Sequence, residues 1–61
     1  MTAAAPLRAL VVDDDVLVRT ATSRALTQEG FICEVAVDGK TGMETLLTAN
    51  FDVAVIDLRM P

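Results

Sequence analysis

The 61-residue sequence contains no histidine, a single cysteine, three glycines and two prolines. Because imidazole is missing, histidine catalysis and histidine-ligated metal sites are excluded. One cysteine, Cys33, cannot form an internal disulfide framework. Such cysteine usage is typical of the reducing cytoplasm, where we expect the protein to lie. We interpret Cys33 as a small apolar side chain on a strand.

Basic residues and long apolar runs are scarce as well. The five lysine and arginine residues are scattered, so the sequence lacks the basic patch of a nucleic-acid-binding surface and we expect no direct nucleic-acid partner. No apolar run approaches the roughly 18 residues of a membrane-spanning helix. Residues 1–6 are too short and uncharged for a signal peptide, and we expect them to form a flexible tail ahead of a folded unit at residues 7–61.

Acidic residues, by contrast, gather at the ends of two apolar runs. The net charge is −4, and the four aspartates that equal this excess are Asp13, Asp14, Asp15 and Asp57. The first three follow the apolar residues 9–12, and the fourth follows the apolar residues 53–56. Each run has the length of a buried strand, so the carboxylates are predicted to stand where two strands end.

The hydrophobic pattern alternates between strand and helix. Strands are predicted at residues 7–12, 31–37 and 51–56, the last of them buried on both faces. A first helix is predicted between the aspartates, where Asp14 or Asp15 can cap it, and Gly30, which can take the left-handed conformation that ends it. A second helix is predicted at about residues 40–49, with Asn50 as a left-handed cap. The charge of Glu34 favours an edge position for the second strand.

Apolar residues at helical spacing predict which faces of the two helices are buried. For the first helix these residues are Leu17, Val18, Ala21, Ala25 and Leu26. For the second helix they are Met43, Leu46 and Leu47.

This β-α-β-α-β pattern predicts an α/β fold with a parallel three-stranded sheet. The strand order 2-1-3 places the helices on opposite faces of the sheet and the first strand beside the third. Asp13, Asp14 and Asp57 then meet at the carboxyl ends of neighbouring strands, where parallel sheets bind ligands. Clustered carboxylates repel one another unless a cation lies between them, and oxygen ligands favour Mg²⁺, with Mn²⁺ as a second choice.

Two stretches of this sequence resemble the response-regulator receiver family. They are Leu-Val-Val-Asp-Asp-Asp at residues 10–15 and Asp-Val-Ala-Val-Ile-Asp-Leu-Arg-Met-Pro at residues 52–61. The separation of Asp14 from Asp57, Gly30-Phe31 before the second strand and Asp38-Gly39 before the second helix also suit the family. The resemblance covers residues 7–61 and implies the N-terminal half of a flavodoxin-like receiver fold.

The resemblance implies a role for each matching position. Asp57 is the implied phosphoacceptor, which takes a phosphoryl group from the phosphohistidine of a histidine kinase or phosphotransfer protein. Asp14 is implied to bind Mg²⁺ directly, and Asp13 directly or through water. The backbone carbonyl of Arg59 is a further implied ligand. The chain is then a phosphoacceptor signalling domain rather than an enzyme, because the partner kinase supplies the phosphoryl group.

The sequence also departs from the family pattern. Within residues 1–61 we find neither the hydroxyl residue that ends the family's fourth strand nor the lysine that ends its fifth. Lys40 opens the second helix on the far side of the second strand and cannot replace that lysine. We therefore expect these 61 residues alone not to be competent for signalling.

The sequence also suggests three other interpretations. Asp13-x-Asp15 after a strand is similar to the nucleophile loop of haloacid-dehalogenase-like phosphatases, in which Asp13 attacks and Asp15 is the general acid. Gly39-Lys40-Thr41 is similar to part of a phosphate-binding loop, but the glycine needed five residues earlier is Glu34. The third interpretation is a self-associating structural fragment with a vestigial metal site.

Self-association is expected because nothing in residues 1–61 pairs with the outer edge of the third strand. Val11, Val53, Val55 and Ile56 are expected to lie partly bare. An antiparallel pair of third strands in a homodimer would give a sheet of order 2-1-3-3-1-2, and exchange of a strand-helix element is the other route.

Overall fold

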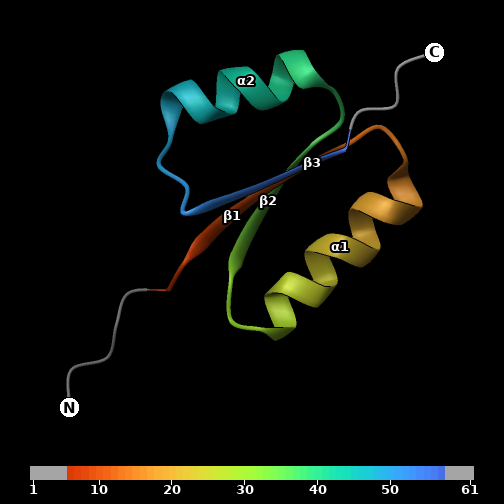
Figure 1. Ribbon diagram of the computed structural model, residues 1–61, viewed down its shortest axis with the longest axis vertical. Helices are drawn as coiled ribbons and strands as arrows, with labels where there is room; N and C mark the ends of the chain where they lie inside the picture. Colours follow the sequence, from red (N-terminus) through yellow and green to blue (C-terminus); the bar gives the residue numbers. More distant parts are fainter. Residues whose placement is uncertain (1–5, 58–61) are drawn as a thin grey trace.

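The computed structural model describes residues 6–57 and shows an α/β fold, as predicted. Five elements follow one another along the chain (Figure 1). They are β1 (Arg8–Asp13), α1 (Val16–Gln28), β2 (Ile32–Ala36), α2 (Gly39–Thr48) and β3 (Val53–Asp57). Each element lies within two or three residues of its predicted bounds. The first and third strands both extend one residue further than predicted, so that each includes its terminal aspartate.

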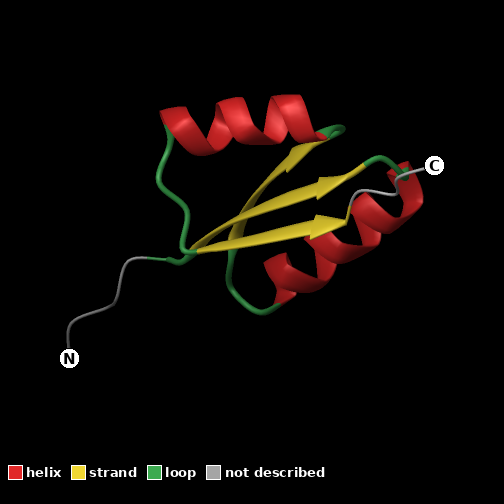
Figure 2. Ribbon diagram, turned by 45° about the horizontal axis from the view of Figure 1, so that its top comes forward, coloured by secondary structure: helices red, strands yellow, loops and turns green. Residues whose placement is uncertain are grey.

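The three strands form one parallel sheet in the order β2-β1-β3, which confirms the predicted topology. The two helices lie on opposite sides of this sheet (Figure 1), and the three strands point in the same direction (Figure 2). The edge position predicted for β2 from Glu34 is also confirmed. All three strands therefore present their carboxyl ends at one edge of the sheet.

Both helices begin at an aspartate that satisfies free backbone N–H groups. The Asp15 carboxylate accepts from the N–H groups of Leu17 and Val18, and the Asp38 carboxylate accepts from the N–H of Thr41. After α1, Gly30 has the left-handed φ of 97° that was predicted. The prediction for Asn50 was wrong, because no residue other than glycine has a positive φ among residues 6–57. The helix α2 ends at Thr48, and the capping residue Ala49 is extended.

The core of the described chain is the central strand β1. Its residues Ala9, Leu10, Val11 and Val12 are at most 1% exposed, and Ala36 of β2 is 2% exposed. Leu46 and Phe51 pack against Leu10, Val12 and Ala36 on the α2 side. The expectation that Val11 lies partly bare was wrong, since β1 has a strand on each edge and a helix over each face.

The predicted apolar stripe of α1 is confirmed in part, because Val18 and Leu26 are partly buried. Leu17, Ala21 and Ala25 are exposed, with Leu17 78% exposed, whereas Arg19 and Ser23 are partly buried. The Cys33 thiol on β2 donates to the Ser23 carbonyl at 3.5 Å, which places this part of α1 against β2. The partly buried face of α1 therefore combines apolar residues with polar ones such as Ser23.

Helix α2 also approaches the sheet through a small residue. Gly42 is buried, and a Cβ built on it would lie 2.7 Å from Cγ2 of Val12. Of the predicted stripe, Leu46 packs on the core, but Met43 and Leu47 are 59% and 79% exposed. The close approach at Gly42 rotates these two side chains away from the sheet.

Strand β3 is exposed along its length within residues 6–57, so the prediction of burial on both faces was wrong for the described chain. Val55 is 36% and Ile56 53% exposed. The reason is that β3 contacts β1 alone among the described elements, while both helices lie over β1 and β2.

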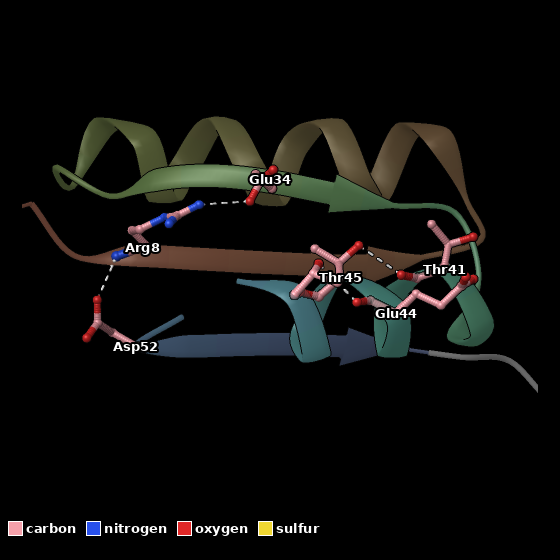
Figure 3. Close-up of polar contacts among 7 residues, drawn as sticks. Arg8, Glu34, Thr41, Glu44, Thr45 and Asp52 are labelled. Atoms are coloured by element: carbon pink, nitrogen blue, oxygen red, sulfur yellow. Dashed lines mark hydrogen bonds and ion pairs between the residues drawn. The ribbon is translucent and has the colours of Figure 1, made fainter. Parts of the chain in front are cut away.

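At the amino-terminal side of the sheet, Arg8 of β1 contacts Glu34 of β2 and Asp52, the residue before β3 (Figure 3). Its guanidinium donates to Glu34 at 3.0 Å, and its backbone N–H donates to the Asp52 carboxylate at 2.8 Å. The guanidinium also lies 5.2 Å from the ring centroid of Phe51. These polar contacts hold the edge opposite the aspartates. Neither helix in residues 6–57 has the length and apolar character needed to cross a membrane.

Candidate functional site

Asp13 and Asp57 are direct neighbours at the carboxyl edge of the sheet. Each is the last residue of its strand, and the pairing of β1 with β3 sets them opposite each other. The loop that joins β1 to α1 lies beside the end of β3 in both views (Figures 1 and 2). The topology therefore brings together the two aspartates that the sequence placed at strand ends.

The three consecutive aspartates of this loop have different surroundings. Asp13 is 3% exposed, and its Oδ1 accepts from the backbone N–H of Asp15 at 2.9 Å. Asp14 is exposed. Asp15 is half-buried and caps α1 through its Oδ1, 2.9 Å from the N–H of Leu17. Asp14 and Asp57 are therefore the carboxylates open to solvent, while Asp13 and Asp15 also shape the turn.

Arg19 is a site residue that sequence reasoning missed. Its Nη1 donates to the backbone carbonyl of Asp13 at 2.8 Å, in partly buried surroundings. Helical spacing places Arg19 mostly on the face of α1 opposite the predicted apolar stripe. The available signal was its position within one helical turn of Asp15, from which a long side chain reaches back to the preceding strand end.

Asp38 follows β2 at the same edge of the sheet and caps α2. Hydrogen bonds from the backbone and side chain of Thr41 hold the pKa of Asp38 below its ordinary value of 3.8, and Lys40 lowers it further. Its carboxylate is thus ionised and caps α2 by accepting the hydrogen bond from the Thr41 N–H.

The carboxyl edge of the sheet carries carboxylate oxygens, which are hard metal ligands, on a surface that forms no pocket within the described chain. No pocket is formed by residues 6–57, and no group of three or more acidic or cysteine side chains that could hold a metal ion occurs among them. The predicted convergence of three carboxylates is therefore not formed in the side-chain positions. Mg²⁺ is commonly held by one or two carboxylates and several waters, and the neighbouring Asp13 and Asp57 match that donor chemistry. Arg59, the implied carbonyl ligand, lies outside the described residues.

Residues 9–61 match the family described as the response regulator receiver domain. The chain belongs to this family. The match includes the strand β1, the aspartate loop and β3, so it covers every residue of the carboxyl edge described above. No solved structure matches the chain significantly.

Curated relatives of this receiver sequence are named as regulators. It is 40% identical over 90% of its length to the transcriptional regulatory protein QseB of Haemophilus influenzae, and 39% identical over 92% to the response regulator MprA of Mycolicibacterium vanbaalenii. It is 38% identical over 88% to the alkaline phosphatase synthesis transcriptional regulatory protein SphR of Synechococcus elongatus. The chain spans about a quarter of the length of these relatives, 25%, 24% and 24% respectively.

The phosphatase interpretation does not fit the receiver geometry. A nucleophilic Asp13 needs an open carboxylate, but this side chain is 3% exposed and one of its oxygens is bound by the Asp15 N–H. The exposed carboxylate at a strand end is Asp57.

Proposed function

We propose that the chain is a phosphoacceptor in two-component signalling and that Asp57 is the acceptor. The observation that carries this proposal is the exposed Asp57 carboxylate at the end of β3, directly opposite the buried Asp13, in a receiver sequence. The partner is a histidine kinase or phosphotransfer protein that presents a phosphohistidine, in the cytoplasm.

In this proposal a carboxylate oxygen of Asp57 attacks the phosphorus of the phosphohistidine. The new O–P bond gives an acyl phosphate, the N–P bond breaks, and the imidazole leaves and takes a proton from solvent. The chain supplies the nucleophile and its position, and the partner supplies the phosphoryl group. In that sense it is a signalling substrate and not an enzyme.

Asp13, Asp14 and Asp57, with the Arg59 carbonyl, are the proposed ligands of Mg²⁺ or Mn²⁺. Bound at this edge, the ion neutralises charge on the transferred oxygens. Of these residues, Asp13 is buried and Asp14 exposed, so Asp13 would hold the ion from the protein side and Asp14 from the solvent side. Because three carboxylates are not gathered in the described structure, we expect weak affinity.

Labelling with a small phosphodonor tests the acceptor. A longer protein that contains this chain should take up acid-labile, hydroxylamine-sensitive label, and Asp57→Asn should abolish it. The 61-residue chain should take up little label, because the family's hydroxyl and lysine positions have no counterpart in it. Trapping with borohydride locates the modified residue, and label on Asp13 would refute the assignment.

Titration with Mg²⁺ tests the metal site separately. The backbone amides of Asp14 and Asp57 should shift in NMR spectra of the 61-residue chain, and Mn²⁺ should broaden the same signals. No change at millimolar ion, which is the weak end of protein oxygen sites, would remove the metal from the proposal.

A further inference from the structure

We propose that Arg19 is a positioning residue for Asp14. Asp14 is exposed, but both of the peptide groups that flank it are bound. The carbonyl of the Asp13–Asp14 peptide accepts from Arg19 Nη1 at 2.8 Å, and the N–H of the Asp14–Asp15 peptide donates to Asp13 Oδ1 at 2.9 Å. Fixing both peptide planes fixes the backbone dihedrals from which the Asp14 side chain projects.

The anchor for this loop is helix α1 itself. The backbone N–H of Arg19 donates to the Asp15 carbonyl at 2.9 Å, while the Asp15 carboxylate caps the same helix. The guanidinium therefore acts from a rigid first turn and reaches back to the last residue of β1. Helix, loop and strand end are closed into one hydrogen-bonded unit around Asp14.

Arg19 also carries a positive charge beside a proposed cation site, and its two effects on the site have opposite signs. As a charge it repels a divalent ion, so its removal should strengthen binding. As an anchor of the loop it orders a ligand, so its removal should weaken binding, as loss of outer-shell partners of metal ligands does. The sign of the change in affinity separates the two effects.

This inference rests on the proposed metal site, and Arg24 provides the matched control. Arg24 is exposed on the same helix, and Arg24→Met removes the same charge as Arg19→Met. Mn²⁺ broadening and Mg²⁺ shifts of the Asp14 amide give the affinity of each 61-residue variant. Dispersion of the remaining amide signals confirms that each variant is folded.

We expect Arg19→Met to weaken Mg²⁺ binding about tenfold, the low end of the range for outer-shell partners. Arg24→Met should leave it unchanged or slightly stronger, and Arg19→Lys, which keeps the charge and a donor, should recover part of the loss. Equal or tighter binding by Arg19→Met would overturn the positioning role and leave the metal site standing.

A second measurement needs no metal. Hydrogen exchange of the Asp15 amide should accelerate in Arg19→Met and not in Arg24→Met. Unchanged exchange would show that Arg19 does not order the loop. Faster exchange in a chain that binds no ion would retain the loop anchor and overturn the metal role of both proposals.

Discussion

At the scale of single residues, aspartates of the same type serve different purposes because of where they stand. Asp15 and Asp38 satisfy the free N–H groups of helix termini, and Asp13 is buried in the turn between β1 and α1. Asp57 lies at the exposed end of β3. The exposed carboxylate of Asp57 makes no helix cap, and this separates the proposed acceptor from Asp15 and Asp38.

The cap at Asp38 makes a prediction about pH. Its pKa lies below 3.8 because the N–H and hydroxyl of Thr41 favour the ionised form. A lowered native pKa means that the stabilisation is complete above 3.8 and is lost as the pH falls through the lower, native value. The Cγ resonance of Asp38 should therefore titrate below 3.8 in the folded chain.

Asp38→Asn provides the comparison for this titration, since asparagine still caps a helix but carries no charge. The difference in free energy of unfolding between the two chains should shrink over the same acidic range. A Cγ resonance of Asp38 that titrates at or above its ordinary pKa would contradict the prediction.

At the scale of elements, Gly42 sets how closely α2 packs on β1. In Gly42→Ala the new Cβ would lie 2.7 Å from Cγ2 and 3.2 Å from Cγ1 of Val12, which is 1% exposed and cannot move freely. Overpacking costs about 1–3 kcal/mol, and alanine returns about 1 kcal/mol of helix propensity. We expect a net loss of about 1 kcal/mol in the free energy of unfolding, measured by urea denaturation.

The matched background for this change is Val12→Ala, which removes the atoms that the new methyl meets. In that background Gly42→Ala should cost less than in the wild type, or should stabilise the chain. Equal costs in both backgrounds would show that the contact with Val12 does not limit the packing of α2.

The same packing explains how far the elements could be predicted from the sequence. Strand and helix positions, the sheet order and the Gly30 terminus followed from apolar runs, aspartate caps and the rules of parallel sheets. The helix faces followed only in part. Val18, Leu26 and Leu46 are partly buried as predicted, but Ser23 and Gly42 also turn inward, while Leu17 and Leu47 turn outward. A hydrophobic pattern cannot show that a small residue is selected for close approach. Likewise, the contact of Arg19 with the Asp13 carbonyl was not predicted, because a charged residue in a helix is usually expected to face solvent.

At the scale of the whole molecule, the described sheet is covered by helices over β1 and β2 but is exposed at β3. Both helices and β2 surround β1, whereas β3 has a single neighbour and exposes Val53, Val55 and Ile56. The sequence predicts a buried strand at this position because residues 53–56 are apolar on both faces. The apolar pattern therefore predicts that both faces of β3 need to be buried. The elements of residues 6–57 leave these faces exposed.

We predict that the 61-residue chain covers this edge by pairing β3 with a second copy. In an antiparallel pair about a twofold axis, a register centred on Val55 pairs all five residues of β3. Val55 then faces its own mate, Ala54 faces Ile56 of the other copy, and each Asp57 faces a valine instead of an aspartate. This register closes two open edges with one set of hydrogen bonds and keeps the carboxylates apart.

Sedimentation equilibrium of the wild type at micromolar concentrations should therefore give a dimer mass. Val55→Lys should give a monomer, because like charges meet across the axis, whereas Gln28→Lys, which adds the same charge at the end of α1, should remain dimeric. A mixture of Val55→Lys with Val55→Asp should associate again, since opposite charges then face each other. A monomeric wild type with well-dispersed amide signals would contradict the prediction, and a dimer that survives both Val55 variants would indicate exchange of a strand-helix element instead.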